Sequence, residues 1–152
     1  MEKIWVKSYP KDVPEHADLD KYSSLADIIE TAMERFKERP AFHCIGTTIS
    51  FFDLDKKSRD FAAYLQDQLG YKRGDVIALM MPNILQYPIA LFGALRAGLT
   101  VANVNPLYTP RELEHQLKDC GAKAIVIVEN FAHTLEAVIS KTPVRQVILT
   151  QL

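Results

Sequence analysis

The segment Val76–Met81, with the sequence VIALMM, is an unbroken apolar run that ends at Pro82-Asn83. Three further apolar runs follow, at residues 99–104, 124–128 and 146–149, and a stretch of helical character separates each run from the next. Continuous apolar strands that alternate with helices are typical of a parallel sheet covered by helices on both faces. The sequence therefore predicts an α/β fold with a doubly wound, mainly parallel sheet.

Two helices and a short N-terminal hairpin are expected ahead of these runs. The apolar spacing predicts a helix over residues 25–36 with Ser24 as its N-cap. A longer helix is expected from Ser50 to Gly70, and the β-rich segments around Gly46 predict a hairpin between the two helices. The helices that separate the sheet strands are expected over residues 86–97, 109–120 and 131–141.

The pattern divides the chain into two parts. Residues 1–22 contain two prolines and no sustained period, which predicts an extended N-terminal arm, and residues 23–152 form one α/β subdomain. The run at 146–149 resembles a sheet strand, yet no helical stretch follows it to cover its outer side. We therefore expect a fragment of a longer protein, truncated at a strand, and the alternative is a domain that ends in a short tail after an edge strand.

Composition excludes several classes of protein. The 152 residues carry 18 Lys and Arg against 19 Asp and Glu, a net charge of −1 with interleaved signs, which argues against nucleic-acid binding. Residues 76–95 carry no charge, but Pro82 and Pro88 interrupt them, so we expect a buried strand and helix and no transmembrane span. Cys44 and Cys120 are too far apart for a CxxC motif and are interpreted as apolar core residues.

The sequence gives few candidates for chemistry. Ligands of doubly wound sheets bind at the carboxyl ends of the strands, where Asn83, Asn103 and Asn130 recur; alternatively, asparagine simply serves the strand-to-helix turns there. No glycine-rich phosphate loop is present. Glu112 and His115 have an ExxH spacing, which we interpret as an acidic helix start because a second copy of the motif is missing. No catalytic or metal-binding residue is therefore predicted.

Several segments resemble the N-terminal part of bacterial long-chain fatty-acid CoA ligases, members of the adenylate-forming superfamily. They are LMMPN at 79–83, QYP at 86–88, LFGALRAG at 91–98 and NVNPLYTPREL at 103–113. The resemblance implies a reaction in which a fatty acid and ATP with magnesium give an acyl-adenylate, from which CoA displaces AMP. It also implies that the catalytic groups come later in the family's chains. This chain alone is then expected to be inactive and to bind none of these cofactors tightly, its partner being the remainder of the same chain.

The resemblance further implies two sets of contacts. Residues near the CoA nucleotide would be Asn105, Pro106, Leu107, Asn130 and His133. Candidate dimer contacts in the arm are Ile4, Trp5, Val6 and Tyr9, with a free tail as the alternative. The family's location would be cytoplasmic, with peripheral association with the inner membrane. A different hypothesis is a free-standing, flavodoxin-like ligand-binding or interaction module with its ligand at the asparagine-bearing strand ends.

Overall fold

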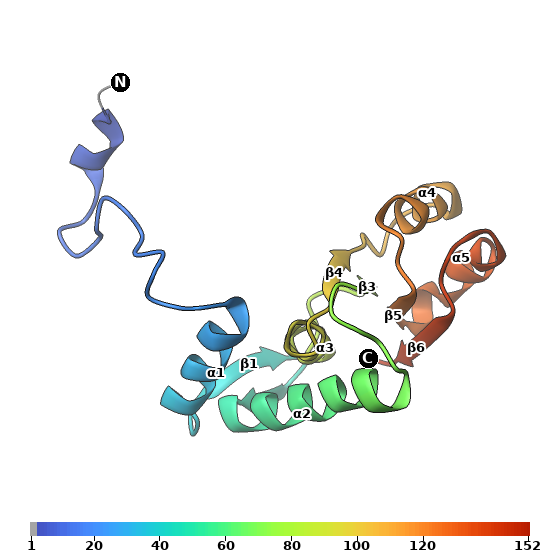
Figure 1. The fold of residues 1–152 in the computed structure, drawn as a ribbon, viewed down its shortest axis with the longest axis horizontal. Coiled ribbons are helices and arrows are strands. Elements are labelled where there is room, and N and C mark those ends of the chain that lie inside the picture. The colour runs from blue at the N-terminus through green and yellow to red at the C-terminus, as the bar shows by residue number, and fades with distance from the viewer. Residues whose placement is uncertain (1–2) are drawn as a thin grey trace.

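The computed structural model describes residues 3–152. The N-terminal arm extends away from the rest of the chain (Figure 1). One 3-10 turn, η1 (Ile4–Ser8), lies in the arm and none of its residues is buried. The arm then runs without helix or strand to α1 (Leu25–Arg35), at a distance from the sheet (Figure 1). Apart from Val6 and Tyr22, which are half-buried, the residues of this segment are exposed.

Four parallel strands form the central sheet, which confirms the predicted fold class. They are β3 (Val76–Met80), β4 (Thr100–Asn103), β5 (Ala124–Val128) and β6 (Gln146–Thr150), in the spatial order β4-β3-β5-β6. Ile77 pairs with Val101 on one side and Ala124 on the other. The most buried strand, β5, has no exposed residue because it lies inside the sheet and is covered on both faces.

Helices cover both faces of the sheet (Figure 1). α2 (Phe51–Ala63) and α3 (Gln86–Arg96) pack on the face that carries Ile77 and Leu79. α4 (Pro110–Cys120) and α5 (Ala132–Glu136) pack on the face that carries Ala78 and Met80. Alternate residues of one apolar strand thus feed two separate core clusters, as expected for a strand with a period of two.

The two helices on the first face approach each other closely. A Cβ atom added at Gly93 of α3 would lie 2.9 Å from the Ser58 carbonyl oxygen of α2 and 2.7 Å from Cδ1 of Phe61. Only a residue without a side chain fits between the two helices at this point. Gly93 therefore sets the distance between α2 and α3.

A third core cluster joins α1, the hairpin, the first turn of α2 and one side of α3 as far as its last turn. The hairpin pairs β1 (Pro40–Cys44) with β2 (Thr47–Ser50) in antiparallel register. The predicted N-cap Ser24 is confirmed, and Ser50 and Thr109 cap α2 and α4 in the same way, since each of the three accepts a hydrogen bond from the backbone N–H three residues on. These caps satisfy donors that would otherwise have no partner in the first turn.

Two predicted helices differ from the observed ones. The helix from Ser50 changes at its end into a π-helical turn, η2 (Tyr64–Gln68), which buries Leu65 completely. The helix expected over 131–141 is broken into η3 (Glu129–Phe131), α5 and η4 (Ile139–Lys141). The backbone leaves the helical region at Phe131, where φ is −107°, and again at Val138, where φ is −133° and the side chain is buried in the core.

The cysteines also differ from expectation. Both are free thiols that pack against a core cluster, but both are half-buried rather than fully inside it. Cys44 is the last residue of β1, at the hairpin turn, and Cys120 is the last residue of α4, beside the left-handed cap Gly121. Each therefore lies at the end of an element, at the margin of a core cluster. Within residues 3–152 no helix is long and apolar enough to cross a membrane.

Candidate functional site

The carboxyl ends of the parallel strands meet at one edge of the sheet, where folds of this kind bind ligands. From β3 the chain steps to β4 on one side and then crosses to β5 on the other, so the strand order reverses beside β3. Pro82-Asn83 follows β3 and Glu129-Asn130 follows β5. These two turns therefore flank the position where a ligand is expected.

Polar side chains at this edge bind one another. The hydroxyl of Tyr87 donates a hydrogen bond to Asn103 Oδ1 at 3.0 Å. Gln86 Nε2 donates to the carbonyl oxygen of Gln151 at 2.6 Å, and Gln151 Nε2 donates to Glu129 Oε2 at 2.9 Å. Hydrogen bonds thus connect the carboxyl edge of the sheet to the start of α3. The side-chain oxygen of Asn103 already accepts a hydrogen bond from within the protein.

The residues expected near a CoA nucleotide lie on two exposed turns at this edge. Asn105, Pro106 and Leu107 follow β4, where Asn105 Oδ1 accepts a hydrogen bond from the Leu107 N–H at 3.0 Å and the Leu107 side chain is 83% exposed. Asn130 and His133 follow β5 and are exposed, with His133 Nε2 3.3 Å from the hydroxyl of the next residue. Because β3 separates β4 from β5, the two turns share an edge without being neighbours in the sheet. Their contact with CoA stays a prediction.

The arm residues expected to join subunits are accessible. Ile4, Trp5 and Tyr9 are 65%, 51% and 41% exposed, and Val6 is half-buried. Ile4, Trp5 and Tyr9 lie on η1 or directly after it, so three large apolar side chains are exposed close together. Exposed apolar side chains that cluster in this way are common at protein interfaces. Their role in a dimer also stays a prediction.

The ExxH spacing serves a helix cap. Glu112 Oε2 accepts hydrogen bonds from the Thr109 hydroxyl at 2.7 Å and from the Thr109 backbone N–H at 2.8 Å. These two bonds lower the pKa of Glu112. In the part of the chain that the structure describes, no group of three or more His, Cys, Asp and Glu residues could hold a metal ion. The interpretation of this motif as an acidic helix start is confirmed.

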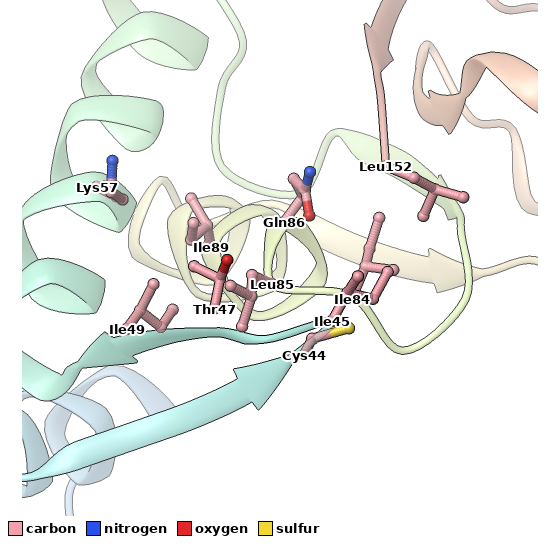
Figure 2. A pocket seen from close by; sticks show the side chains of 10 residues that line it. All are labelled: Cys44, Ile45, Thr47, Ile49, Lys57, Ile84, Leu85, Gln86, Ile89 and Leu152. Atoms are coloured by element: carbon pink, nitrogen blue, oxygen red, sulfur yellow. The ribbon is translucent and has the colours of Figure 1, made fainter.

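A groove that the sequence did not predict lies between the hairpin, α2 and the start of α3 (Figure 2). It has a volume of about 400 Å³. Six isoleucine and leucine side chains line it, together with Cys44, Thr47, Lys57 and Gln86. The apolar lining residues are Ile45, Ile49, Ile84, Leu85, Ile89 and Leu152. The groove is therefore an apolar channel with few polar groups, which is the usual composition of a small-molecule site.

An ionic cluster links α2 and α3, which line the groove, with α1. The Arg96 side chain from α3 is only 5% exposed, and its Nη2 donates to Asp55 Oδ1 on α2. Glu30 of α1 lies 3.7 Å from Arg96 Nη1 and 3.6 Å from Arg59 Nη2. Burial raises the pKa of Asp55, but hydrogen bonds from Arg59 and Arg96 outweigh it, so the pKa is lower than normal. The cluster holds α1, α2 and α3 in a fixed arrangement.

One residue of the sequence is unusual for the hairpin turn beside the groove, although it does not locate the groove itself. Ile45 precedes Gly46 at the hairpin turn, and both residues have positive φ, 48° and 73°. Turns of this kind favour Asn, Asp or Gly at both positions, whereas a β-branched residue is strained there. Ile45 is also 77% exposed. A strained and exposed isoleucine at a tight turn is a residue that the fold alone does not explain.

A family model and the curated relatives both match this chain to the same family of enzymes. The family model described as "AMP-binding enzyme" matches residues 29–152. The chain is 63% identical over all 152 residues to a long-chain-fatty-acid–CoA ligase of Yersinia pestis and 60% identical to one of Escherichia coli O157:H7. The chain spans only 27% of the length of each of these relatives.

Solved structures have the same fold. A long-chain-fatty-acid-CoA ligase from Archaeoglobus fulgidus aligns with a TM-score of 0.76 and 27% identity over 84% of this chain and 27% of that one. A benzoate CoA ligase from Burkholderia xenovorans aligns with a TM-score of 0.77 and 24% identity over 83% of this chain and 25% of that one. The second likeness concerns the fold alone.

Proposed function

Because this chain belongs to the AMP-binding enzyme family, we propose that it is the N-terminal part of a long-chain fatty-acid CoA ligase. The observation that carries the proposal is 63% identity over all 152 residues to a protein of that description. Since the chain spans 27% of the length of that relative, the proposed activity is that of the whole protein.

The proposed reaction activates a carboxylate in two steps. A carboxylate oxygen of the fatty acid attacks the α-phosphorus of ATP, the bond to pyrophosphate breaks, and an acyl-adenylate forms. The thiol of CoA, which loses its proton, then attacks the acyl carbonyl, and the bond to AMP breaks. The first step converts the carboxylate oxygen into part of a good leaving group, which the second step requires.

Residues 3–152 do not fit the groups that would bind ATP and magnesium. No cluster of carboxylates able to hold a metal ion occurs among them, and the sequence has no glycine-rich phosphate loop. We therefore assign ATP and magnesium binding to the part of the protein outside this chain. The chain supplies a rigid α/β scaffold and, at its carboxyl edge, the turns at Asn105–Leu107 and Asn130–His133 as proposed contacts of the CoA nucleotide.

The N-terminal arm is the proposed contact between subunits. Trp5 and Ile4 are more than half exposed and lie on a turn away from the body of the chain (Figure 1). Burial of these side chains against a second copy would remove apolar surface from water. Light scattering of the full-length protein and of its Trp5→Ser variant tests this, since the variant is expected to shift the population toward monomer.

The proposed location is the cytoplasm, where ATP and CoA are available, with peripheral association with the inner membrane for access to fatty acids. Fractionation of cells that produce the full-length protein tests this location. The protein is expected in the soluble fraction and, in part, on membranes from which salt or alkali releases it.

The deciding experiment measures the products of the full-length protein with palmitate, ATP, Mg²⁺ and CoA. Palmitoyl-CoA and AMP are expected in equal amounts, and without CoA only the acyl-adenylate and pyrophosphate should form. The 152-residue chain alone, as control, is expected to be inactive. Formation of ADP in place of AMP, or no thioester at all, would refute the proposal.

A further inference from the structure

The residues after β6 lead into the groove between the hairpin, α2 and α3. Leu152 is one of its lining residues and lies at the end opposite to Lys57 (Figure 2). Two hydrogen bonds hold the residue before it, since the Gln151 carbonyl oxygen accepts from Gln86 Nε2 at 2.6 Å and Gln151 Nε2 donates to Glu129 Oε2 at 2.9 Å. The backbone is therefore held beside the start of α3, and a residue that follows Leu152 starts at this end of the groove.

The walls of the groove carry apolar surface that the described residues leave uncovered. Ile45 and Leu152 are 77% and 68% exposed, and Leu85 and Ile89 on the α3 side are half-buried. Ile45 also has a φ of 48°, which asparagine or glycine would adopt at a lower cost in stability. Burial of apolar side chains is favourable, so a partner that covers them would account for an isoleucine at this turn.

The length of the relatives indicates which partner this is. The chain spans only 27% of the length of its curated relatives, and under the proposed function it is their N-terminal part, so most of the protein follows Leu152. The first of these residues are tethered at the end of the groove. A short tether gives an effective concentration on the order of 1 mM, which exceeds the concentration of a second copy in dilute solution. Mass action therefore favours the tethered segment over a second copy.

We propose that the segment directly after Leu152 packs in the groove and places apolar side chains against Ile45, Leu85 and Ile89. The groove is then an internal contact through which the remainder of the protein holds the hairpin against α2 and α3. The choice of occupant rests on the proposed function, because it requires that the protein continue beyond Leu152.

Photochemical cross-linking of the full-length protein tests this contact. Growth with a leucine analogue that carries a diazirine places the reactive group at Leu85, inside the groove. After irradiation and digestion, mass spectrometry should find the peptide that contains Leu85 joined to the peptide that follows Leu152. A mixture of labelled and unlabelled copies distinguishes a link within one chain from a link between two chains. Links from Leu85 only to other parts of the protein, or only to a second copy, would overturn the proposal.

Two neighbouring threonines of β2 provide a matched pair of variants. Thr47 lines the groove, whereas the hydroxyl of Thr48 lies 2.7 Å from His43 Nδ1, since consecutive side chains of a strand point to opposite sides. Both threonines are exposed. Thr47→Arg places a long, charged side chain in the groove and should displace the segment, whereas Thr48→Arg should not.

Hydrogen exchange of the two full-length variants, followed by mass spectrometry, measures this displacement. Amides directly after Leu152 should exchange about tenfold faster, or more, in Thr47→Arg than in Thr48→Arg. Burial of even one leucine or isoleucine side chain shifts the equilibrium between the docked and the open segment by about that factor. Equal exchange rates in the two variants would contradict the proposed contact.

Acyl-CoA formation by the same preparations separates the two hypotheses. A protein that forms palmitoyl-CoA, while Leu85 is linked only to other segments, retains the proposed function and loses this contact. A protein in which Leu85 is linked to the segment after Leu152, but which forms no acyl-CoA, keeps the contact and loses the proposed reaction.

Discussion

Gly93→Ala is expected to force α2 and α3 apart. The added methyl group would lie 2.7 Å from Phe61 Cδ1 and 2.9 Å from the Ser58 carbonyl oxygen. The aromatic ring can turn away, but the carbonyl belongs to the backbone of α2, so one of the two helices must shift. This shift would disturb the core cluster between these helices and the sheet.

Two opposite effects decide the size of the change. Alanine is more favourable than glycine inside a helix by about 1 kcal/mol. Overpacking of a filled interior costs about 1–3 kcal/mol, and a contact with backbone belongs at the upper end of that range. The free energy of unfolding should therefore fall by about 2 kcal/mol. For a chain of this length the Tm should fall by about 4–8 °C.

Urea denaturation of the 152-residue chain, followed by circular dichroism, measures this difference. The same substitution in a Phe61→Ala background serves as a control, because it removes the contact with the ring and keeps the contact with the Ser58 oxygen. Part of the cost of Gly93→Ala should therefore remain in that background. A midpoint that is unchanged or higher in Gly93→Ala would refute the close approach of the two helices.

Further predictions concern the ionic cluster, a helix cap and the hairpin turn. Asp55→Asn should lower the free energy of unfolding by about 2 kcal/mol and cost more than Arg96→Met, because it removes the carboxylate that accepts a hydrogen bond from the buried Arg96 guanidinium and leaves only Glu30, 3.7 Å away; urea midpoints of both variants check this order. Since the pKa of Asp55 lies below 3.8 when folded, its stabilisation is complete above that pH and is lost as the pH falls through the folded value, so stability of Asp55→Asn should depend less on pH below 3.8. Thr109→Ala removes the cap of α4 and should cost about 1 kcal/mol, measured by the same denaturation. Ile45→Asn should raise the free energy of unfolding of the 152-residue chain by about 1 kcal/mol, because asparagine tolerates a positive φ, and urea denaturation checks this increase.

The sheet and its caps could be predicted because their signals are local. The run from Val76 is apolar at every position, so both faces of the strand carry apolar side chains. This pattern is typical of a strand that is covered on both sides. Thr109 is the N-cap of α4, Pro110 its first helical residue and Glu112 the partner in the capping box. Four consecutive residues therefore predict the start of this helix. Such patterns are independent of the rest of the fold, and the structure confirms them.

Features that depend on packing between distant segments could not be predicted. The helix expected after β5 is interrupted at Val138, whose backbone leaves the helical region while its side chain is buried against distant parts of the chain. The groove brings Ile45 and Lys57 together with Ile84, residues from the hairpin, α2 and the turn before α3. Its position depends on how the hairpin packs against α3, for which no short motif exists.

The position of β6 at the end of the sheet affects how this chain behaves at high concentration. Its outer edge presents backbone N–H and carbonyl groups that no neighbouring strand of the described sheet receives. Its five residues include no Lys, Arg or Pro, the residues that commonly protect such edges, and Leu149 is 59% exposed. Copies of the isolated chain can therefore add strand to strand, and purification at low concentration will favour the monomer.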